Sequence, residues 1–162
     1  MRLPPFSVFL EEYRVPVFRF LMASVGPDHA DDCFQETFLS ALRAYPRLQP
    51  GTNLRAWILT IAGRKAIDHE RGRRRRAIPV AEVPEVPAHG SPGSPDGEPE
   101  LWRAVRQLPP MQRGAIVQRY VLDLSYREVA EVLGCSEEAA RANAHEARRR
   151  LRARLLAAKE EG

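Results

Sequence analysis

Side chains able to read DNA bases recur at helical spacing near the carboxyl-terminal end of the sequence. Arginine can donate two hydrogen bonds to a guanine edge and glutamate can accept one from cytosine, so a helix that displays both can recognise bases in the major groove. Further along the same helix, Arg148 is better placed for phosphates. The base-reading stripe contains Glu138, Ala142, His145 and Arg149, with Ser136 at the predicted helix start and Arg141 and Arg152 along the border.

A helix-turn-helix pattern would position this stripe. Ser125 and Glu128 have the spacing of a capping box, which begins the first helix, and Gly134 can adopt the positive φ that ends it. An ordinary helical hairpin with a solvated arginine face would give the same pattern, so the assignment depends on the rest of the chain. The predicted buried side of the second helix lies within about 60° of Ala144 and contains Ala140, Ala147, Leu151 and Leu155.

The distribution of charge divides the chain into two parts. The 162 residues carry a net charge of +4, but residues 77–100 contain no Lys or Arg and five acidic residues. Six prolines and three glycines there indicate a flexible acidic linker, although a long ordered loop packed on one domain is the alternative. We therefore predict an all-α protein with two small helical domains, residues 1–76 and 101–162, the second containing the helix-turn-helix.

The clearest amphipathic helix of the first part spans residues 31–45. Its apolar face is predicted to pack on a helix over residues 6–22 that is interrupted or kinked near Pro16. Leu39 on the opposite side has no core to enter, which favours a protein partner, although single exposed leucines are common. The apolar face contains Phe34, Phe38, Ala41, Leu42 and Tyr45, and the opposite face contains Asp32, Gln35, Glu36, Leu39 and Arg43.

A third helix, from about residue 54 to residue 71, carries an indole beside guanidinium groups. Bases of separated DNA strands stack on aromatic rings, and their phosphates attract arginine, so this stripe favours melted DNA. The alternatives are a half-buried Trp57 and a basic run at 71–76 that is only a solvated tail. The candidate residues are Trp57, Thr60, Arg64, Asp68, Arg71, Arg73 and Arg74.

Signals of catalysis, cofactor or metal binding and membrane insertion are missing from the sequence. It lacks a paired nucleophile and base, a phosphate loop and any CxxC or HxxxH spacing, so it predicts no enzyme, cofactor or metal site. Cys33 and Cys135 are expected to be small core residues. The sequence contains neither a secretion signal nor a run of 18 apolar residues, and we expect a cytoplasmic protein.

Three segments in the same order resemble the extracytoplasmic-function (ECF) sigma factors of bacteria, which are small two-domain transcription initiation factors. DDCFQETFLSALRAY is similar to the polymerase-binding helix of that family, and AWILTIAGRKAIDHERGRRRR to its promoter-melting helix. LPPMQRGAIVQRYVLDLSYREVAEVLGCS is similar to the start of its second DNA-binding domain. The resemblance implies a protein without catalytic chemistry that directs core RNA polymerase to promoters and is regulated by an anti-sigma factor.

The resemblance also implies roles for the three surfaces. The polar face of residues 31–45 would bind the clamp helices of the largest polymerase subunit. The stripe from Trp57 to Arg74 would bind and melt the minus 10 element, and the stripe from Ser136 to Arg149 would read the minus 35 element. Departures from the family pattern, such as Arg64 in place of a frequent Asn and an added Glu146, concern promoter specificity.

Two other classes of protein share part of this pattern. A sigma mimic that sequesters an anti-sigma protein would not need Trp57, Arg64 or the basic run at 71–76. A stand-alone helix-turn-helix repressor would explain residues 125–155 but would leave the acidic face of residues 31–45 without a role. Both alternatives therefore leave conspicuous residues unexplained.

Overall fold

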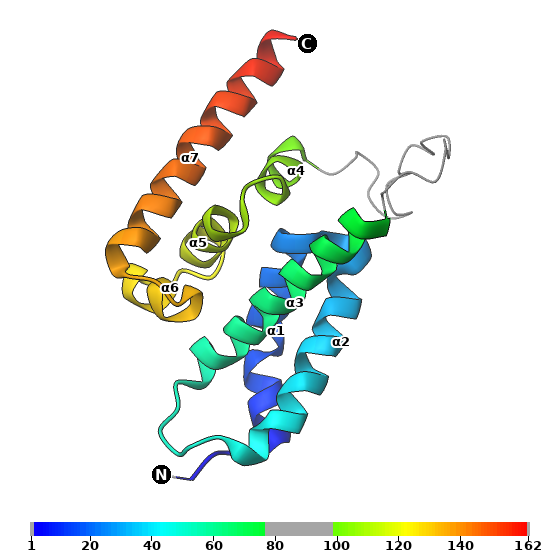
Figure 1. The fold of residues 1–162 in the computed structure, drawn as a ribbon, viewed down its shortest axis with the longest axis vertical. Helices are drawn as coiled ribbons and strands as arrows, with labels where there is room; N and C mark the ends of the chain where they lie inside the picture. The colour runs from blue at the N-terminus through cyan, green and yellow to red at the C-terminus, as the bar shows by residue number, and fades with distance from the viewer. Residues whose placement is uncertain (1, 77–98, 162) are drawn as a thin grey trace.

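The computed structural model describes residues 2–76 and 99–161, and every regular element in these ranges is helical (Figure 1). The predicted all-α class is confirmed. The expected linker at 77–100 lies almost entirely outside the described residues. The elements are α1 (Phe6–Val25), α2 (Pro27–Ala44), the 3-10 turn η1 (Tyr45–Arg47), α3 (Leu54–Arg76), α4 (Glu100–Arg106), α5 (Pro110–Tyr120), α6 (Tyr126–Leu133) and α7 (Glu137–Glu160).

The first three helices pack on one another as a small bundle. α1 and α2 meet at Gly26, whose φ of 85° ends the first helix and lets the chain reverse. Pro16 lies inside α1, which continues to Val25, so the predicted interruption is wrong. Burial of Val17, Phe20 and Leu21 holds the helix beyond the proline despite the backbone donor that proline lacks.

One residue on the predicted apolar face of α2 is exposed. Leu42 keeps 50% of its surface accessible, so its assignment to the core is wrong. α2 packs on both α1 and α3, and this shifts its buried side toward Cys33 and Thr37. The buried Thr37 hydroxyl finds its hydrogen-bond partner within the same helix, because it donates to the backbone oxygen of Cys33 at 2.6 Å.

An aromatic cluster fills the end of the bundle where α1, η1 and α3 meet. The ring of the fully buried Phe9 lies 5.1 Å from Tyr45 and 5.7 Å from Trp57, measured between centroids. The Tyr45 hydroxyl donates to the backbone oxygen of Pro4 at 2.6 Å, which ties the segment before α1 to the same cluster. The cluster therefore fixes where α3, with its candidate DNA-binding stripe, begins.

The C-terminal helices contain the predicted helix-turn-helix. The Ser125 hydroxyl accepts from the Glu128 backbone at 3.2 Å, and the Glu128 carboxylate accepts from the Ser125 backbone at 2.8 Å, which is the predicted capping box. Gly134 ends α6 with a φ of 67°, and Ser136 caps α7 by accepting from Ala139. Of the predicted buried side of α7, Leu155 is half-buried and the other members are buried.

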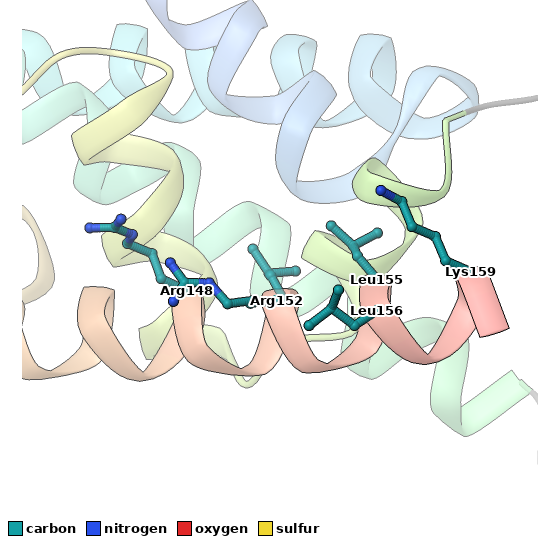
Figure 2. A pocket seen from close by; sticks show the side chains of 6 residues that line it. Arg148, Arg152, Leu155, Leu156 and Lys159 are labelled. Atoms are coloured by element: carbon teal, nitrogen blue, oxygen red, sulfur yellow. The ribbon is translucent and has the colours of Figure 1, made fainter.

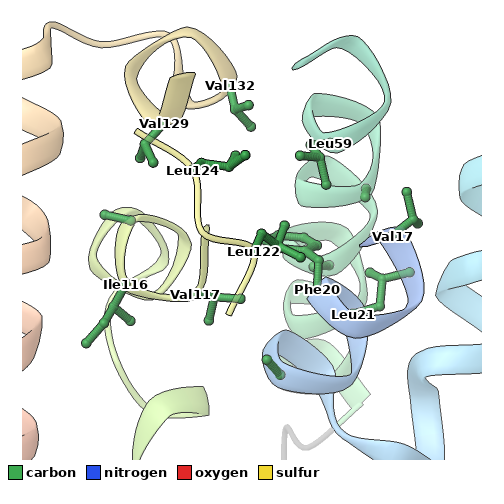
Figure 3. Packing of buried hydrophobic residues seen from close by; sticks show 14 of the residues in the cluster. Val17, Phe20, Leu21, Leu59, Ile116, Val117, Leu122, Leu124, Val129 and Val132 are labelled. Atoms are coloured by element: carbon green, nitrogen blue, oxygen red, sulfur yellow. The ribbon is translucent and has the colours of Figure 1, made fainter. Parts of the chain in front are cut away.

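The two groups of helices also pack against each other. α3 contacts α6, and α1 contacts both α4 and α5. Leu122 and Leu124, in the segment between α5 and α6, are buried in this region together with Phe20 and Leu59 (Figure 3). The hydrophobic core is therefore continuous from the bundle into the helix-turn-helix.

We predict that the aromatic cluster is a main source of stability. Phe9→Ala should lower the free energy of unfolding by about 3–5 kcal/mol because it leaves a cavity among several rings. Val8→Ala, at the preceding residue, is the matched control. The Val8 side chain is 51% exposed, so its truncation should lower the free energy of unfolding by less than about 0.5 kcal/mol. Urea denaturation followed by circular dichroism measures both, and similar losses would contradict this assignment.

Candidate nucleic-acid and protein interfaces

The base-reading stripe predicted on α7 is open to solvent. Glu138, Ala142, His145 and Arg149 are all exposed, whereas Ala144 on the opposite side is fully buried. The hydroxyl of Ser136 is engaged in capping, so this residue positions the start of the helix. The geometry is that of a helix which packs on one side and presents the other to a ligand.

Arg141 is held close to the start of α7 by two neighbours. Its guanidinium lies 3.3 Å from the Glu137 carboxylate and 5.0 Å from the centroid of the Tyr126 ring, which begins α6. The ion pair is exposed, so exchanging Glu137 for a base edge has a small energetic cost. Arg141 is thus positioned at the end of the helix where recognition helices meet base edges.

Glu146 forms a charged cluster that sequence reasoning did not anticipate. Its carboxylate accepts from Arg149 at 2.5 and 3.0 Å and lies 3.4 Å from Arg150. Hydrogen bonds and charge attraction from Arg149, with a smaller contribution from Arg150, lower the pKa of Glu146 to about 2. Arg149 and Arg150 follow Glu146 by three and four positions, and this spacing in the sequence could have indicated the cluster. Arg149 of the predicted stripe and the adjacent Arg150 are consequently partly neutralised within the helix.

Arg148 lies on a different side of α7 from this stripe. Its guanidinium donates to the Tyr120 hydroxyl at 3.2 Å and lies 5.7 Å from the centroid of that ring. It borders two adjoining apolar hollows, which together form a groove beside α7. The hollow between α7 and the pair α4 and α5 is lined by Leu101, Trp102, Val105, Ile116 and Leu151. The hollow along α7 itself is lined by Leu151, Leu155 and Leu156 and by the cations Arg148, Arg152 and Lys159 (Figure 2).

The stripe predicted on α3 divides into two parts. Trp57 is half-buried in the aromatic cluster, and the Thr60 hydroxyl lies 2.7 Å from the Ala56 oxygen and 3.2 Å from the Val132 oxygen of α6. Beyond Thr60 the stripe is accessible, and α3 continues to Arg76, five residues past its predicted end. The exposed members are Arg64, Asp68, Arg71 and Arg73, and Arg74 belongs to the same helix.

The polar face of α2 forms a separate accessible surface. Leu39 keeps 52% of its surface exposed in the middle of this face. On the buried side of α2, burial together with the charges of Glu36 and Asp32 raises the pKa of the Cys33 thiol to about 11, so that thiol stays protonated and unreactive at neutral pH. The face is completed by Asp32, Gln35, Glu36 and Arg43, all exposed.

Two kinds of site, a metal centre and a membrane span, have no candidate in the described parts of the chain. Residues 2–76 and 99–161 contain no group of three or more His, Cys, Asp or Glu side chains that could hold a metal ion. Over the same ranges, none of the helices combines the length and apolar character needed to span a bilayer.

Both halves of the chain match families of known proteins. The profile of Sigma-70 region 2 matches residues 9–76, and that of Sigma-70, region 4 matches residues 99–151. The chain is 38% identical over 128 residues to the RNA polymerase sigma factor CarQ of Myxococcus xanthus, which covers 76% of this chain and 72% of CarQ. It is 34% identical over 146 residues to the ECF RNA polymerase sigma factor EcfG of Rhodopseudomonas palustris, covering 87% and 80%.

Solved structures with the same arrangement of helices include two proteins that were each determined in a complex with another protein. The sigma factor RpoE in complex with the anti-sigma factor NepR from Bartonella quintana superposes with a TM-score of 0.72 and 26% identity, covering 94% of this chain and 98% of that chain. CnrH, in complex with the cytosolic domain of CnrY, gives a TM-score of 0.68 at 23% identity, covering 94% and 88%. The likeness to CnrH supports the assignment of the fold alone.

We predict that Glu146 limits the affinity of α7 for DNA. Glu146→Gln should release Arg149 and Arg150, tighten binding to every duplex several-fold and steepen the dependence of log K on log salt by about one. Because the pKa of Glu146 is lowered, mild acid should not reproduce this effect. Glu160→Gln makes the same change of net charge at the far end of α7, and equal effects of the two variants in salt titrations would contradict the prediction.

Proposed function

Because the chain belongs to the ECF RNA polymerase sigma factors, we propose that it binds core RNA polymerase through the polar face of α2 and directs it to promoters read by α3 and α7. The observation that carries this proposal is the exposed stripe of α7, set at the end of a capped helix-turn-helix whose opposite side is buried. A stand-alone repressor is disfavoured because residues 9–76 match Sigma-70 region 2.

The polymerase contact is assigned to α2 because its outward side combines charge with an exposed leucine. Asp32 and Glu36 lie one turn apart and can pair with cations of a partner helix, while Leu39 can bury apolar surface in the same contact. This contact would be made in the cytoplasm, where polymerase and chromosome meet. Polymerase would supply nucleotidyl transfer, so the chain needs no catalytic residues of its own.

The two DNA surfaces have different tasks in this proposal. α3 would bind the minus 10 element with its exposed cations Arg64, Arg71 and Arg73, and the half-buried Trp57 would serve mainly to hold the helix in place. α7 would read the minus 35 element, with Arg141 and the stripe around His145 at base edges. Strand separation would then depend on the positive field of α3 and on polymerase.

An anti-sigma factor is the proposed regulatory partner. RpoE and CnrH were each solved with another protein bound, and the RpoE partner is an anti-sigma factor. On this chain the apolar groove beside α7 is the surface that suits such a partner. Its three cations, Arg148, Arg152 and Lys159, would favour an amphipathic helix that carries acidic residues beside its apolar side.

The polymerase contact can be tested by charge reversal. Asp32→Lys combined with Glu36→Lys should weaken binding to purified core polymerase by about tenfold or more, because like charges would then oppose each other. Helical content should stay unchanged because both side chains are exposed. The control reverses two exposed acids of α1, Glu11 and Glu12. Affinity measurements and run-off transcription provide the readouts, and full binding by the α2 variant would rule out this face.

The base-reading role of α7 can be tested at Arg141. Arg141→Ala should cost about 1–3 kcal/mol on the preferred upstream element and flatten discrimination at one or two base pairs. Arg154→Ala removes an exposed arginine near the other end of α7 and should leave discrimination intact. Titrations on matched and mismatched duplexes separate the two effects. If Arg141→Ala weakens binding equally for every sequence, Arg141 contacts phosphate and the reading role moves to Glu138, His145 and Arg149.

A further inference from the structure

The ring of Tyr126 is a meeting point of three helices in the C-terminal half. Tyr126 begins α6 and is half-buried. The guanidinium of Arg119, from α5, lies 5.3 Å from the centroid of this ring, and that of Arg141, from α7, lies 5.0 Å from the same centroid. Both distances are within the range in which the electron-rich face of an aromatic ring attracts a cation. α5 and α7 therefore each place one arginine on the ring that begins α6.

The backbone that carries this ring is fixed by local contacts. Ser125 and Glu128 form the capping box described above, and their two hydrogen bonds span the first turn of α6, which includes Tyr126. Leu124, next to Ser125, is 1% exposed and belongs to the hydrophobic core. The ring thus projects from a part of the chain that has little freedom to move.

Arg119 anchors the ring to the turn between α5 and α6. Its guanidinium donates to the backbone oxygen of Leu124 at 3.2 Å and lies 3.5 Å from the carboxylate of Asp123. These contacts keep the cation in the turn, beside Tyr126. Its charge therefore favours one orientation of the ring even when no DNA is bound.

Arg141 depends on the ring more than Arg119 does. Its ion pair with Glu137 spans 3.3 Å, but both side chains are more than half exposed, and exposed ion pairs contribute little. A long arginine side chain also loses rotamer freedom when it is held in one place. The contact with Tyr126 restrains the guanidinium without using an N–H donor. This contact can therefore persist when the donors turn from Glu137 to a base edge.

We propose that Tyr126 is a positioning residue for sequence recognition: its ring holds the Arg141 guanidinium at the start of α7, in the arrangement from which that side chain reads a base. The proposal rests on the proposed function and adds to it a residue that need not touch DNA. Preorganisation lowers the ordering cost of the matched contact, so it strengthens binding of the matched sequence most. Phosphate contacts depend on charge and are the same for every sequence, so they change little.

Paired substitutions at Tyr126 test this role in DNA binding. Tyr126→Leu removes the ring but keeps an apolar side chain. It should lower the affinity for the preferred upstream duplex by about two- to fivefold, the loss expected for an exposed cation–π contact. The affinity for a duplex mismatched at the base pair read by Arg141 should stay unchanged. Tyr126→Phe keeps the ring and should behave like the unaltered protein.

A double-mutant cycle separates the effect on Arg141 from other effects of the ring. In a protein that already carries Arg141→Ala, Tyr126→Leu should cause no further loss of affinity for the matched duplex. The matched control is Tyr120→Leu, because the Tyr120 ring lies 6.0 Å from Arg119 and 5.7 Å from Arg148. This control should leave discrimination between duplexes intact. Thermal denaturation followed by circular dichroism shows that each variant is folded.

Nuclear magnetic resonance of the free protein tests the contact without DNA. In the unaltered protein, the Nε–H group of Arg141 should be more ordered on the picosecond to nanosecond timescale than that of Arg154, which is exposed near the other end of α7. The ring current of Tyr126 should also shift the side-chain protons of Arg141 upfield. Tyr126→Leu should abolish both effects, and Tyr126→Phe should preserve them.

The outcomes distinguish failure of this inference from failure of the proposed function. If Arg141→Ala flattens discrimination while Tyr126→Leu does not, or if Arg141 of the free protein is as mobile as Arg154, Tyr126 does not position Arg141 and the inference is overturned. Equal losses on matched and mismatched duplexes in Tyr126→Phe would assign the hydroxyl to a phosphate contact and overturn it too. If the unaltered protein binds all upstream duplexes alike, the proposed function fails, and the inference fails with it.

Discussion

The close packing of α7 on its neighbours determines where the side chains that we propose to contact DNA point. The buried side of α7 near the turn consists of alanines, Ala140, Ala144 and Ala147, which are too small to hold the helix away from α5 and α6. Gly114 serves the same purpose on α5, because a Cβ atom there would lie 2.9 Å from the Leu133 side chain. The three helices are therefore held in one orientation, and the polar stripe on the opposite side of α7 is fixed with them.

Features set by neighbours in sequence could be predicted, because their physical cause lies within a few residues. The capping box at Ser125, the positive φ at Gly134 and the alternation of faces on α7 all belong to this class. The accessible side of α2 was predicted for the same reason. Leu42 was misplaced because the buried side of α2 depends on two packing partners, α1 and α3, whose positions no local pattern reveals.

Contacts between distant parts of the chain could not be predicted in this way. Glu70 and Arg113 are 43 positions apart, and nothing in the periodicity of either helix indicates that they meet. Trp57 illustrates the same limit: its spacing with Arg64 left open whether the ring is exposed or half-buried, and the contacts that half bury it come from Phe9 and Tyr45, elsewhere in the chain. The Glu146 cluster is different, since its spacing was visible and only its geometry shows that two arginines share one carboxylate.

The ion pair between Glu70 of α3 and Arg113 of α5, 2.7 Å long, also links the stability of the two halves. Because the hydrophobic core runs through both halves, heat would unfold them as one cooperative unit for as long as they stay packed. A mutation that strengthens the contact would therefore raise the melting temperature of both halves together.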